Sequence, residues 1–209
     1  MTNIFILFSY LIGALPSSVW IGMWFYDTDV REHGSGNAGA TNSFRVLGKR
    51  GGTIVLILDI LKAWVAVKLL SSLAGNESVE FQLALGLVAV LGHIFPIYIG
   101  FRGGKGIASL LGVIIAIQPL AALFSVLVFL ITLILSRFIS LSSIFAACAF
   151  PTLVFYYFKE TNNSLIIFSI MVAVLVIFTH KKNIERLFKK EESKVTILKK
   201  IFKRKQNNN

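Results

Sequence analysis

The chain has 209 residues, of which 56% are hydrophobic and only 15% are charged. This composition is too apolar for an ordinary soluble domain and is typical of a membrane protein. The formal net charge of +11 is explained by membrane topology, because Lys and Arg concentrate in cytoplasmic loops and tails. A nucleic-acid partner is not expected, since no basic stripe lies on a separate folded domain.

The first apolar segment runs from Ile4 to Tyr26 and is interrupted by Gly13, Pro16 and a pair of serines. About 20 residues are enough to cross the hydrocarbon core of a bilayer. A proline is tolerated in such a helix where neighbouring groups satisfy the carbonyl that it frees. We therefore predict a membrane-spanning helix here rather than a cleaved signal peptide, which would need a basic N-terminal region and a shorter apolar run.

A loop rich in glycine and polar residues follows, from Arg31 to Arg50. Its glycines allow tight turns that point backbone N–H groups inward, and its polar and basic side chains add further donors and positive charge. This inventory is typical of a phosphate-binding loop at a membrane surface. The groups concerned are Gly34, Ser35, Gly36, Asn37, Gly39, Thr41, Asn42 and Arg45.

Two other interpretations of this loop are less favoured. Gly34, Gly36 and Gly39 match the spacing of a dinucleotide-binding fingerprint, but that motif follows a β-strand, whereas an apolar helical segment precedes it here. A merely flexible loop would also be rich in glycine, serine and asparagine. The density of donors and the lack of acceptors apart from Glu32 favour the anion site.

The second apolar segment, Gly52 to Leu73, contains Asp59 and Lys62. Their i, i+3 spacing allows them to pair on one helix face. Charges inside a membrane are costly and usually face the protein interior. The pair is therefore either a structural ion pair or part of a site, and the sequence does not separate these alternatives.

The third apolar segment, Phe81 to about Ile99, leads into a second glycine-rich turn. Gly103, Gly104 and Gly106 surround Lys105 and leave the backbone open on both sides of its ammonium group. The turn is not a Walker A loop, because the first glycine and the final Ser/Thr of that motif are missing. By itself it fits a phosphate turn and a basic cytoplasmic turn equally well.

The 29 residues from Ile107 to Leu135 decide the number of crossings. One helix of this length would measure about 43 Å, too long for a hydrocarbon core of about 30 Å, whereas two helices meeting at Pro119 would each be short. Charge settles the choice, because only a double crossing puts the basic tail, with eleven Lys or Arg after His180, on the same side as the other basic loops.

We therefore predict an all-α polytopic membrane protein with seven transmembrane helices, an outside N-terminus and a cytoplasmic C-terminus. The last two spans are Ile139 to Phe158 and Ser164 to Thr179. Residues 1–194 form the membrane domain. Residues 195–209 form a basic cytoplasmic tail, which we expect to contact anionic lipid.

The three histidines, His33, His93 and His180, have no spacing typical of a metal site, so no metal site is expected. His93 is interpreted as a hydrogen-bonded packing residue within an apolar segment. His180 opens a helical pattern in which Asn183 and Arg186 follow at three-residue steps and can face the loops. The alternative is a basic helix that simply leaves the membrane.

No covalent nucleophile is indicated, since the chain lacks G-x-S-x-G and no histidine opens an H-x-x-x-x-D motif. Two phosphate-binding loops without a nucleophile suggest direct transfer between two phosphorylated substrates.

Five motifs, in order, resemble the PlsY family of bacterial acyl-phosphate:glycerol-3-phosphate acyltransferases. They are RxHGSGNxGATNxxRxLGK, DxxK, GHxFPxxxxFRGGKG, RFISLSS and HxxNIxRL. The resemblance implies a seven-span enzyme of the bacterial inner (cytoplasmic) membrane that acts in phospholipid biosynthesis. It implies transfer of a fatty acyl group from acyl phosphate to position 1 of glycerol 3-phosphate, giving lysophosphatidic acid and phosphate, without acyl-CoA, acyl carrier protein, metal or cofactor.

The resemblance also implies roles for individual residues. The acyl phosphate would be bound by Ser35, Gly36, Asn37, Gly39, Thr41 and Asn42. Glycerol 3-phosphate would be bound by Arg45, Lys105, Ser143, His180 and Asn183. Ser35, Arg45, Lys105 and His180 would be catalytic. The family's G-T-E segment is replaced here by Lys190-Glu191-Glu192, so no role is predicted for it.

A further partner suggested by this function is the upstream enzyme that forms acyl phosphate. The competing hypothesis is a membrane transporter or binding protein for an organophosphate anion. It is less favoured, because the chain has no internal repeat and its donor-rich loops lie on one face rather than at the bilayer midplane.

Overall fold

The computed structural model describes residues 2–195 and contains helices but no strand over that range. The α-helices are α1 (Thr2–Gly13), α2 (Ser17–Tyr26), α3 (Ala40–Val46), α4 (Gly48–Leu73), α5 (Val79–Ile94), α6 (Ile107–Ile117), α7 (Pro119–Ser136), α8 (Ile139–Thr152), α9 (Asn163–Thr179) and α10 (Lys181–Phe188). Short 3-10 turns, η1 (Val30–Glu32) and η2 (Ile97–Ile99), and a π-helical turn, η3 (Leu153–Tyr157), complete the elements.

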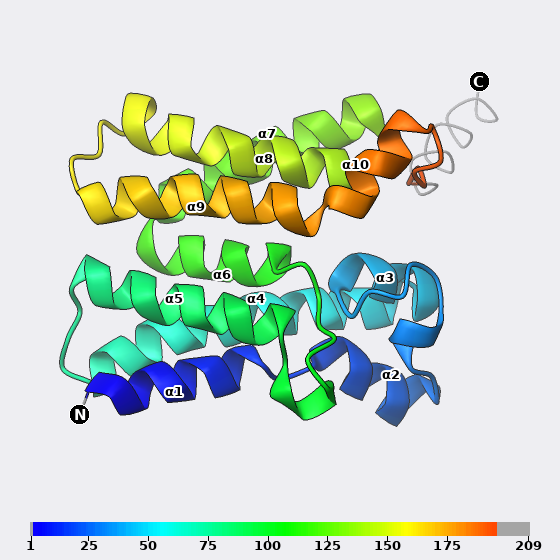
Figure 1. Cartoon of the computed structure of the whole chain (residues 1–209), viewed down its shortest axis with the longest axis horizontal. Coiled ribbons are helices and arrows are strands. Elements are labelled where there is room, and N and C mark those ends of the chain that lie inside the picture. Colours follow the sequence, from blue (N-terminus) through cyan, green and yellow to red (C-terminus); the bar gives the residue numbers. More distant parts are fainter. Residues whose placement is uncertain (1, 196–209) are drawn as a thin grey trace, which may run out of the picture.

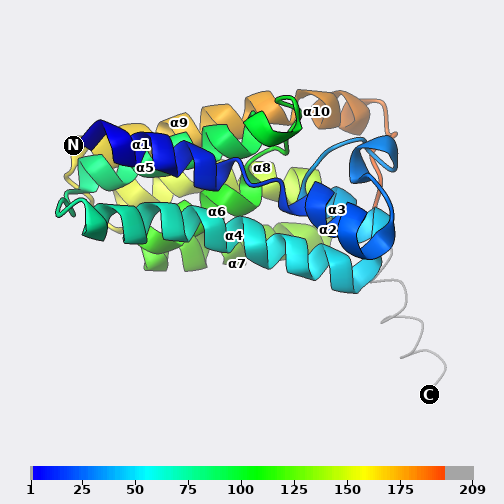
Figure 2. The same cartoon turned by 90° about the horizontal axis from the view of Figure 1, so that it is seen from below.

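The long helices lie side by side along one axis of the molecule (Figure 1). Helices α7, α8 and α9 form one side, α1, α4 and α5 form the other, and α6 lies between them. The N-terminus lies at one end, whereas α2, α3 and α10 gather at the opposite end in two perpendicular views (Figures 1 and 2).

The apolar stretch after Lys105 is two helices, as predicted. Helix α6 ends at Ile117, Gln118 leaves the helical conformation, and α7 begins at Pro119. Proline suits the first position of a helix, because its missing N–H would have no intrahelical partner there. The two helices run in opposite directions on either side of this break (Figure 1).

The first apolar segment is also broken, because α1 ends at Gly13 and α2 begins at Ser17. Its first half packs closely on α5. A Cβ atom at Gly13 would overlap the backbone of Ala89, and one at Gly92 would overlap the carbonyl of Tyr10. The absence of side chains at these two positions therefore sets how closely α1 and α5 approach.

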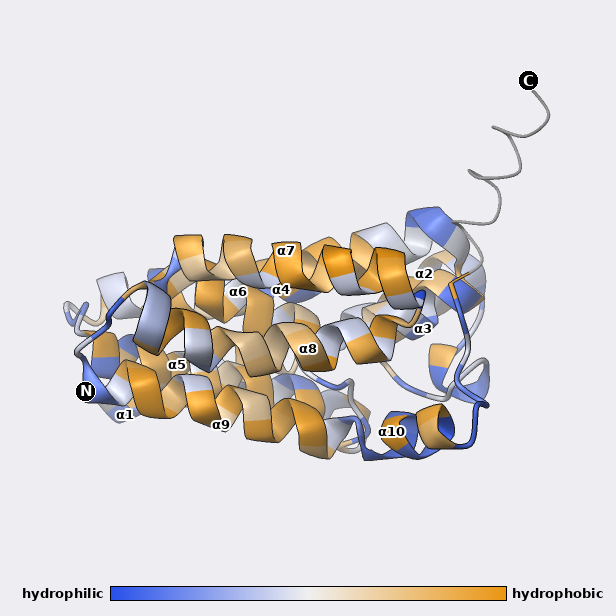
Figure 3. Ribbon diagram, turned by 90° about the horizontal axis from the view of Figure 1, so that it is seen from above, coloured by the Kyte–Doolittle hydropathy of each residue, from blue (hydrophilic) through white to orange (hydrophobic). Residues whose placement is uncertain are grey.

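Four segments of the described chain are long and apolar enough to cross a membrane: Asn3–Tyr26, Val79–Ile99, Pro119–Ser136 and Ile139–Tyr157. Helices α9 and α10, bent by 59° at their junction, would be a fifth if they are taken together. Figure 3 shows an apolar middle between two more hydrophilic ends, one of which is formed by α2, α3 and α10. The protein is thus a multi-pass membrane protein by composition and helix length.

The largest apolar core lies between α5, α6, α8 and α9, where Val113, Phe150 and Val176 are fully buried. Large apolar side chains also point outward, and Leu135 and Phe178 are both 79% exposed. Such a surface is a liability in water but is the expected contact surface for lipid tails.

The basic tail is described only at its start. The backbone N–H of Val195 donates to the carbonyl of Arg137, with an N···O distance of 2.9 Å. The predicted contact of the tail with anionic lipid concerns residues 196–209, which lie outside the described residues.

Candidate active site

Three polar segments that are far apart in sequence meet at the end of the molecule opposite the N-terminus (Figures 1 and 2). They are the glycine-rich loop with α3, the turn before α6, and α10. All three were predicted to lie on one side of the membrane.

Asn42 holds the glycine-rich loop in shape. Its side-chain oxygen accepts a hydrogen bond from the backbone N–H of Ser35 at 2.8 Å, and its amide donates to the carbonyls of Val30 at 2.6 Å and His33 at 3.0 Å. Asn42 is 1% exposed. The amide predicted to contact a ligand is therefore directed at the backbone of its own loop.

The loop leaves several donors available. Gly34 and Gly36 have φ angles of +64° and +71°, which L-residues rarely adopt, so the turn itself requires glycine there. Within the described chain, the backbone N–H groups of Asn37 and Gly39 donate to no protein acceptor. The side chain of Ser35 is exposed. These groups can bind the oxygens of a phosphate.

Arg31 ties this loop to the turn that follows α5. Its guanidinium pairs with Asp29 at 2.7 Å and donates to the carbonyl of Ile99 at 3.0 Å. Beyond this link, a Cβ atom placed on Gly104 would lie only 3.1 Å from the carbonyl oxygen of Ala38. The two glycine-rich turns are thus in direct contact.

Lys105 connects the second turn to α10, because its ammonium donates a hydrogen bond to the side-chain oxygen of Asn183. Burial and the charges of Arg186 and Arg45 lower the pKa of Lys105 to about 8, against the opposing effect of Glu192. The charges of Arg186 and Arg45 thus oppose the charge of Lys105, and a bound anion would relieve that repulsion.

Glu192 is the residue of this site that the sequence analysis missed. Its carboxylate accepts hydrogen bonds from Ser140 at 2.8 Å, Asn183 at 2.7 Å and Arg186 at 2.7 Å. Its side chain is only 4% exposed. The only signal in the sequence was its position at the end of the segment that replaces G-T-E. Glu192 orients Asn183, and through it Lys105.

His180 lies at the bend between α9 and α10 and is 3% exposed. Its Nδ1 donates to the carbonyl of Val176 at 2.8 Å, so Nε2 is left as an acceptor. Burial and the charge of Lys105 lower the pKa of His180 to about 4. The imidazole is therefore neutral at pH 7, and it can accept a hydrogen bond from a hydroxyl group.

Ser143 is buried on α8, and its hydroxyl donates to the carbonyl of Ile139 at 3.0 Å. It lies one helical turn beyond Ser140, which contacts Glu192. Residues three apart share a helix face, whereas Ser142 points about 160° away from Ser140. This placement favours Ser143 over its neighbour as the serine that faces α10.

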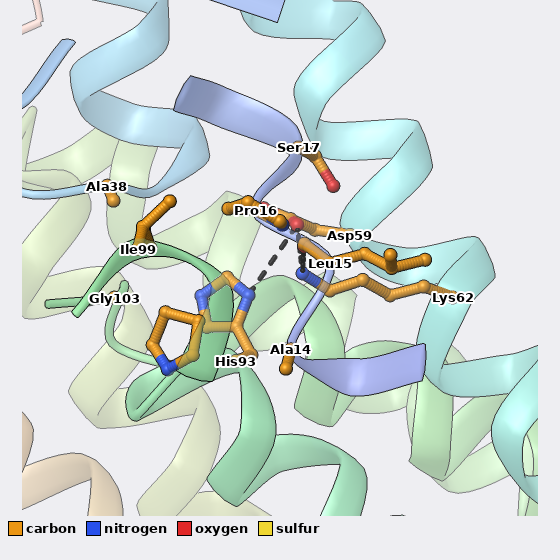
Figure 4. Close-up of a pocket in the computed structure, with 11 residues that line it drawn as sticks. Ala14, Leu15, Pro16, Ser17, Ala38, Asp59, Lys62, His93, Ile99 and Gly103 are labelled. Atoms are coloured by element: carbon orange, nitrogen blue, oxygen red, sulfur yellow. Dashed lines mark hydrogen bonds and ion pairs between the residues drawn. The ribbon is translucent and has the colours of Figure 1, made fainter. Parts of the chain in front are cut away.

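The predicted pair of Asp59 and Lys62 is present, with 2.8 Å between carboxylate oxygen and ammonium nitrogen. His93 is buried, as predicted, and its Nδ1 lies 3.5 Å from Asp59 (Figure 4). The three side chains line a cavity of about 10 Å³ at the break between α1 and α2. This volume is about that of one water molecule and cannot hold a substrate.

Glu192→Gln is expected to lower the free energy of unfolding by about 2 kcal/mol at pH 7, because hydrogen bonds to a charged acceptor are stronger than those to an amide. Although burial alone would raise the pKa of Glu192, the hydrogen bonds from Arg186, Asn183 and Ser140 lower it below 4.5. Its stabilising contribution is therefore present above pH 4.5 and is lost as the pH falls through the folded-state pKa. Thermal unfolding in detergent from pH 7 to pH 3.5 measures this.

The exposed neighbour provides the control, since Glu191→Gln removes the same charge without a buried contact. Equal unfolding curves for the two variants would show that Glu192 does not stabilise this end of the protein.

Comparison with known proteins places these features in a family. Residues 3–190 match the family model described as glycerol-3-phosphate acyltransferase. The chain is 46% identical over 189 residues to the glycerol-3-phosphate acyltransferase of Listeria monocytogenes serovar 1/2a (strain EGD-e), covering 90% of this chain and 94% of that protein. It is 40% identical over 203 residues to the protein of the same name from Staphylococcus aureus (strain Newman), covering 93% and 98%.

The fold is also similar to solved structures. The crystal structure of PlsY (YgiH), an integral membrane glycerol 3-phosphate acyltransferase, in its glycerol 3-phosphate form has a TM-score of 0.87 and 35% sequence identity, covering 96% of this chain and 98% of that one. Its lysophosphatidic acid form has a TM-score of 0.84 and 34% identity. These similarities confirm the family predicted from the motifs.

Proposed function

Since the chain belongs to the glycerol-3-phosphate acyltransferase family and is an acyltransferase of phospholipid synthesis, we propose that it transfers a fatty acyl group from acyl phosphate to position 1 of glycerol 3-phosphate. The products are lysophosphatidic acid and phosphate. The observation that carries this proposal is the contact between the donor-rich loop and the turn of Lys105, which brings two groups of potential phosphate donors side by side.

The two substrates occupy adjoining parts of the site. The loop holds the phosphate of the acyl donor through the hydroxyls of Ser35 and Thr41 and the backbone N–H groups of Asn37 and Gly39. Asn42 keeps the loop in shape, and so does Gly36, whose backbone N–H donates to the carbonyl of His33 at 3.1 Å. Glycerol 3-phosphate contacts Arg45, Lys105, Ser143, His180 and Asn183. Contact between the two glycine-rich turns supports this arrangement, because it brings the two phosphates close together.

In the reaction, the hydroxyl oxygen at position 1 attacks the carbonyl carbon of the acyl phosphate. The bond from that carbon to the phosphate oxygen then breaks, and its electron pair leaves with the phosphate. Acyl phosphate is already activated, so the protein mainly positions the hydroxyl and stabilises negative charge.

The hydroxyl proton goes to a phosphate oxygen of the substrates. A phosphate with a second pKa of about 6 is a stronger base than an imidazole with a pKa of about 4. His180 instead orients the hydroxyl, accepting its hydrogen bond at Nε2.

The protein crosses the bacterial cytoplasmic membrane seven times, with its N-terminus outside and its C-terminus inside. The opposite directions of α6 and α7 support this topology (Figure 1). So does charge, because Arg45 and Lys105 lie toward one end, whereas Glu77, before α5, and Glu80, in its first turn, lie at the other. Helix α6 has only 11 residues, but it is surrounded by the other helices and needs no full lipid-facing length.

Release of phosphate from palmitoyl phosphate by the purified protein in detergent tests the proposed function. We expect release only when glycerol 3-phosphate is added, with lysophosphatidic acid formed in equal amount and without CoA or carrier protein. A folded protein that binds glycerol 3-phosphate but releases no phosphate would favour the organophosphate transporter, whose activity requires sealed vesicles.

The pH dependence of this reaction should reflect the loss of the proton from the ammonium of Lys105. Because its pKa is about 8 in the free protein, we expect kcat/KM for glycerol 3-phosphate to fall above about pH 8 as the ammonium loses its proton. Arginine keeps its charge to far higher pH. In Lys105→Arg the fall should therefore move to higher pH, even if the maximal rate is lower.

Initial rates from pH 6 to pH 10, corrected for uncatalysed hydrolysis of the donor, measure this profile. Lys182→Arg, at an exposed position of α10, is the matched control. An unchanged descending limb in Lys105→Arg would assign that limb to another group.

A further inference from the structure

We propose that His93, held by Asp59, is a positioning residue for the turn that carries Lys105. The inference rests on the proposed function in one respect, namely that Lys105 binds glycerol 3-phosphate. It assigns a role to the buried charged residues between the membrane helices, which are not among the residues proposed to bind either substrate.

The network begins at the break in the first apolar segment. The ammonium of Lys62 donates to the carbonyl of Leu15 at 2.7 Å and pairs with Asp59 at 2.8 Å. The carbonyl of Leu15 lies at a helix break, outside the regular hydrogen bonding of α1, and it also accepts from the backbone N–H of Ser17 at 3.0 Å. Lys62 supplies a second donor, from α4, and holds Asp59 in a fixed position.

Asp59 in turn faces His93 at the end of α5, with 3.5 Å between Oδ1 and Nδ1 (Figure 4). Both side chains are almost fully buried. This contact sets the rotation of the imidazole ring, since Nδ1 is the edge directed at the carboxylate. The other edge of the ring, with Nε2, then faces away from Asp59.

That other edge lies against the second glycine-rich turn. The backbone N–H groups of Gly103 and Gly104 donate to the carbonyls of Ile94 at 3.1 Å and His93 at 3.2 Å. A Cβ atom added to Gly104 would overlap Nε2 of His93, and one added to Gly103 would overlap the carbonyl of His93. The turn therefore rests directly on His93, with no space for a side chain between them.

Lys105 is the next residue along the chain, and its ammonium reaches Asn183 on α10. Its direction is thus determined at both ends, by the backbone seated on His93 and by the amide of Asn183. A displacement of the turn by about 1 Å would misplace the ammonium relative to a bound phosphate, which is enough to weaken catalysis strongly.

A double-mutant cycle between His93 and Gly104 tests the inference in the phosphate-release assay. In Gly104→Ala the new methyl group meets the imidazole, and we expect KM for glycerol 3-phosphate to rise about tenfold or more, with KM for palmitoyl phosphate within about twofold of the parent. His93→Ala should raise the same KM, because the turn loses its support. The double variant should be within about twofold of His93→Ala, since the methyl group then occupies space that the ring has left. It keeps only the 3.1 Å contact with the carbonyl oxygen of Ala38, which a shift of a few tenths of an ångström relieves.

Gly75→Ala, in the turn between α4 and α5, is the control, since its methyl group would meet no atom within 4 Å and the strain of alanine at its φ of +63° would fall at the other end of the molecule. If His93→Ala does not fold, His93→Asn replaces it in the cycle, because its shorter amide also vacates the space at Nε2. Additive effects of the two substitutions, or equal increases in both KM values, would overturn the inference.

Failure of the proposed function can be distinguished from failure of the proposed role of His93. If the folded parent releases no phosphate, the function is wrong. The same four proteins are then compared by how much glycerol 3-phosphate raises their unfolding temperature. If the two substitutions reduce this increase additively, the role of His93 is again overturned.

Discussion

Replacing Lys105 with alanine is expected to lower kcat/KM for glycerol 3-phosphate by about 10²- to 10³-fold, the usual effect of removing one preorganised donor from a charge-stabilising site. Lys105 is the cation that the structure places most centrally. It reaches Asn183 directly, and the charges of Arg186 and Arg45 act on it. The guanidinium of Arg186 is not free to replace it, because it is paired with Glu192 at 2.7 Å.

Steady-state rates of glycerol-3-phosphate-dependent phosphate release measure the effect. Lys182→Ala, which removes an exposed charge from the same end of the protein, should leave kcat/KM within about twofold, because exposed charges contribute little. An equal loss in both variants would mean that the assay responds to net charge at the membrane surface rather than to a bound phosphate.

Lys62→Met is expected to lower the free energy of unfolding by about 3–5 kcal/mol, the cost of removing one partner from a buried ion pair. Asp59 is 1% exposed, and it would keep only His93 at 3.5 Å as a neighbouring polar partner. The carbonyl of Leu15 would also lose one of its two donors and keep only the backbone N–H of Ser17. Methionine is close to lysine in length, so loss of packing should contribute little.

The matched variant removes both charges. Asp59→Asn combined with Lys62→Met leaves no unpaired carboxylate, so we expect it to recover at least half of the stability lost in Lys62→Met. Unfolding of the three proteins in detergent, followed by circular dichroism, provides the comparison. If the double variant is less stable than the single one, the buried carboxylate is not the source of the loss.

Some features were predictable because they depend on residues close together in the chain. A hydrophobic run of 29 residues with a proline near its middle predicts two helices, and the structure breaks at Gln118. Asp59 and Lys62 are one helical turn apart, and helix geometry alone brings them together. The order of the polar motifs likewise predicted the family.

Other features depend on partners that no local pattern indicates. Glu192 appears in the sequence as one acidic residue in a basic segment, yet it contacts Ser140, 52 residues away, as well as Asn183 and Arg186. Asn42 is a residue type expected to contact a ligand, but its amide group forms hydrogen bonds with the backbone of its own loop. Residue type predicts which groups can donate or accept, but not which of them are already engaged.

The sequence by itself determined the membrane class, the apolar segments and the presence of donor-rich glycine turns, because these follow from composition and helical periodicity. Only the tertiary structure decided that positions 103 and 104 must be glycine, because the backbone and ring of His93 lie against them. It also decided that Nε2 is the hydrogen-bond acceptor of His180 and that Glu192 orients Asn183. The physical reason is that burial and hydrogen-bond partners are set by helices packing together over long separations in the chain. The same residue can bind substrate or support the fold, depending on what lies across from it.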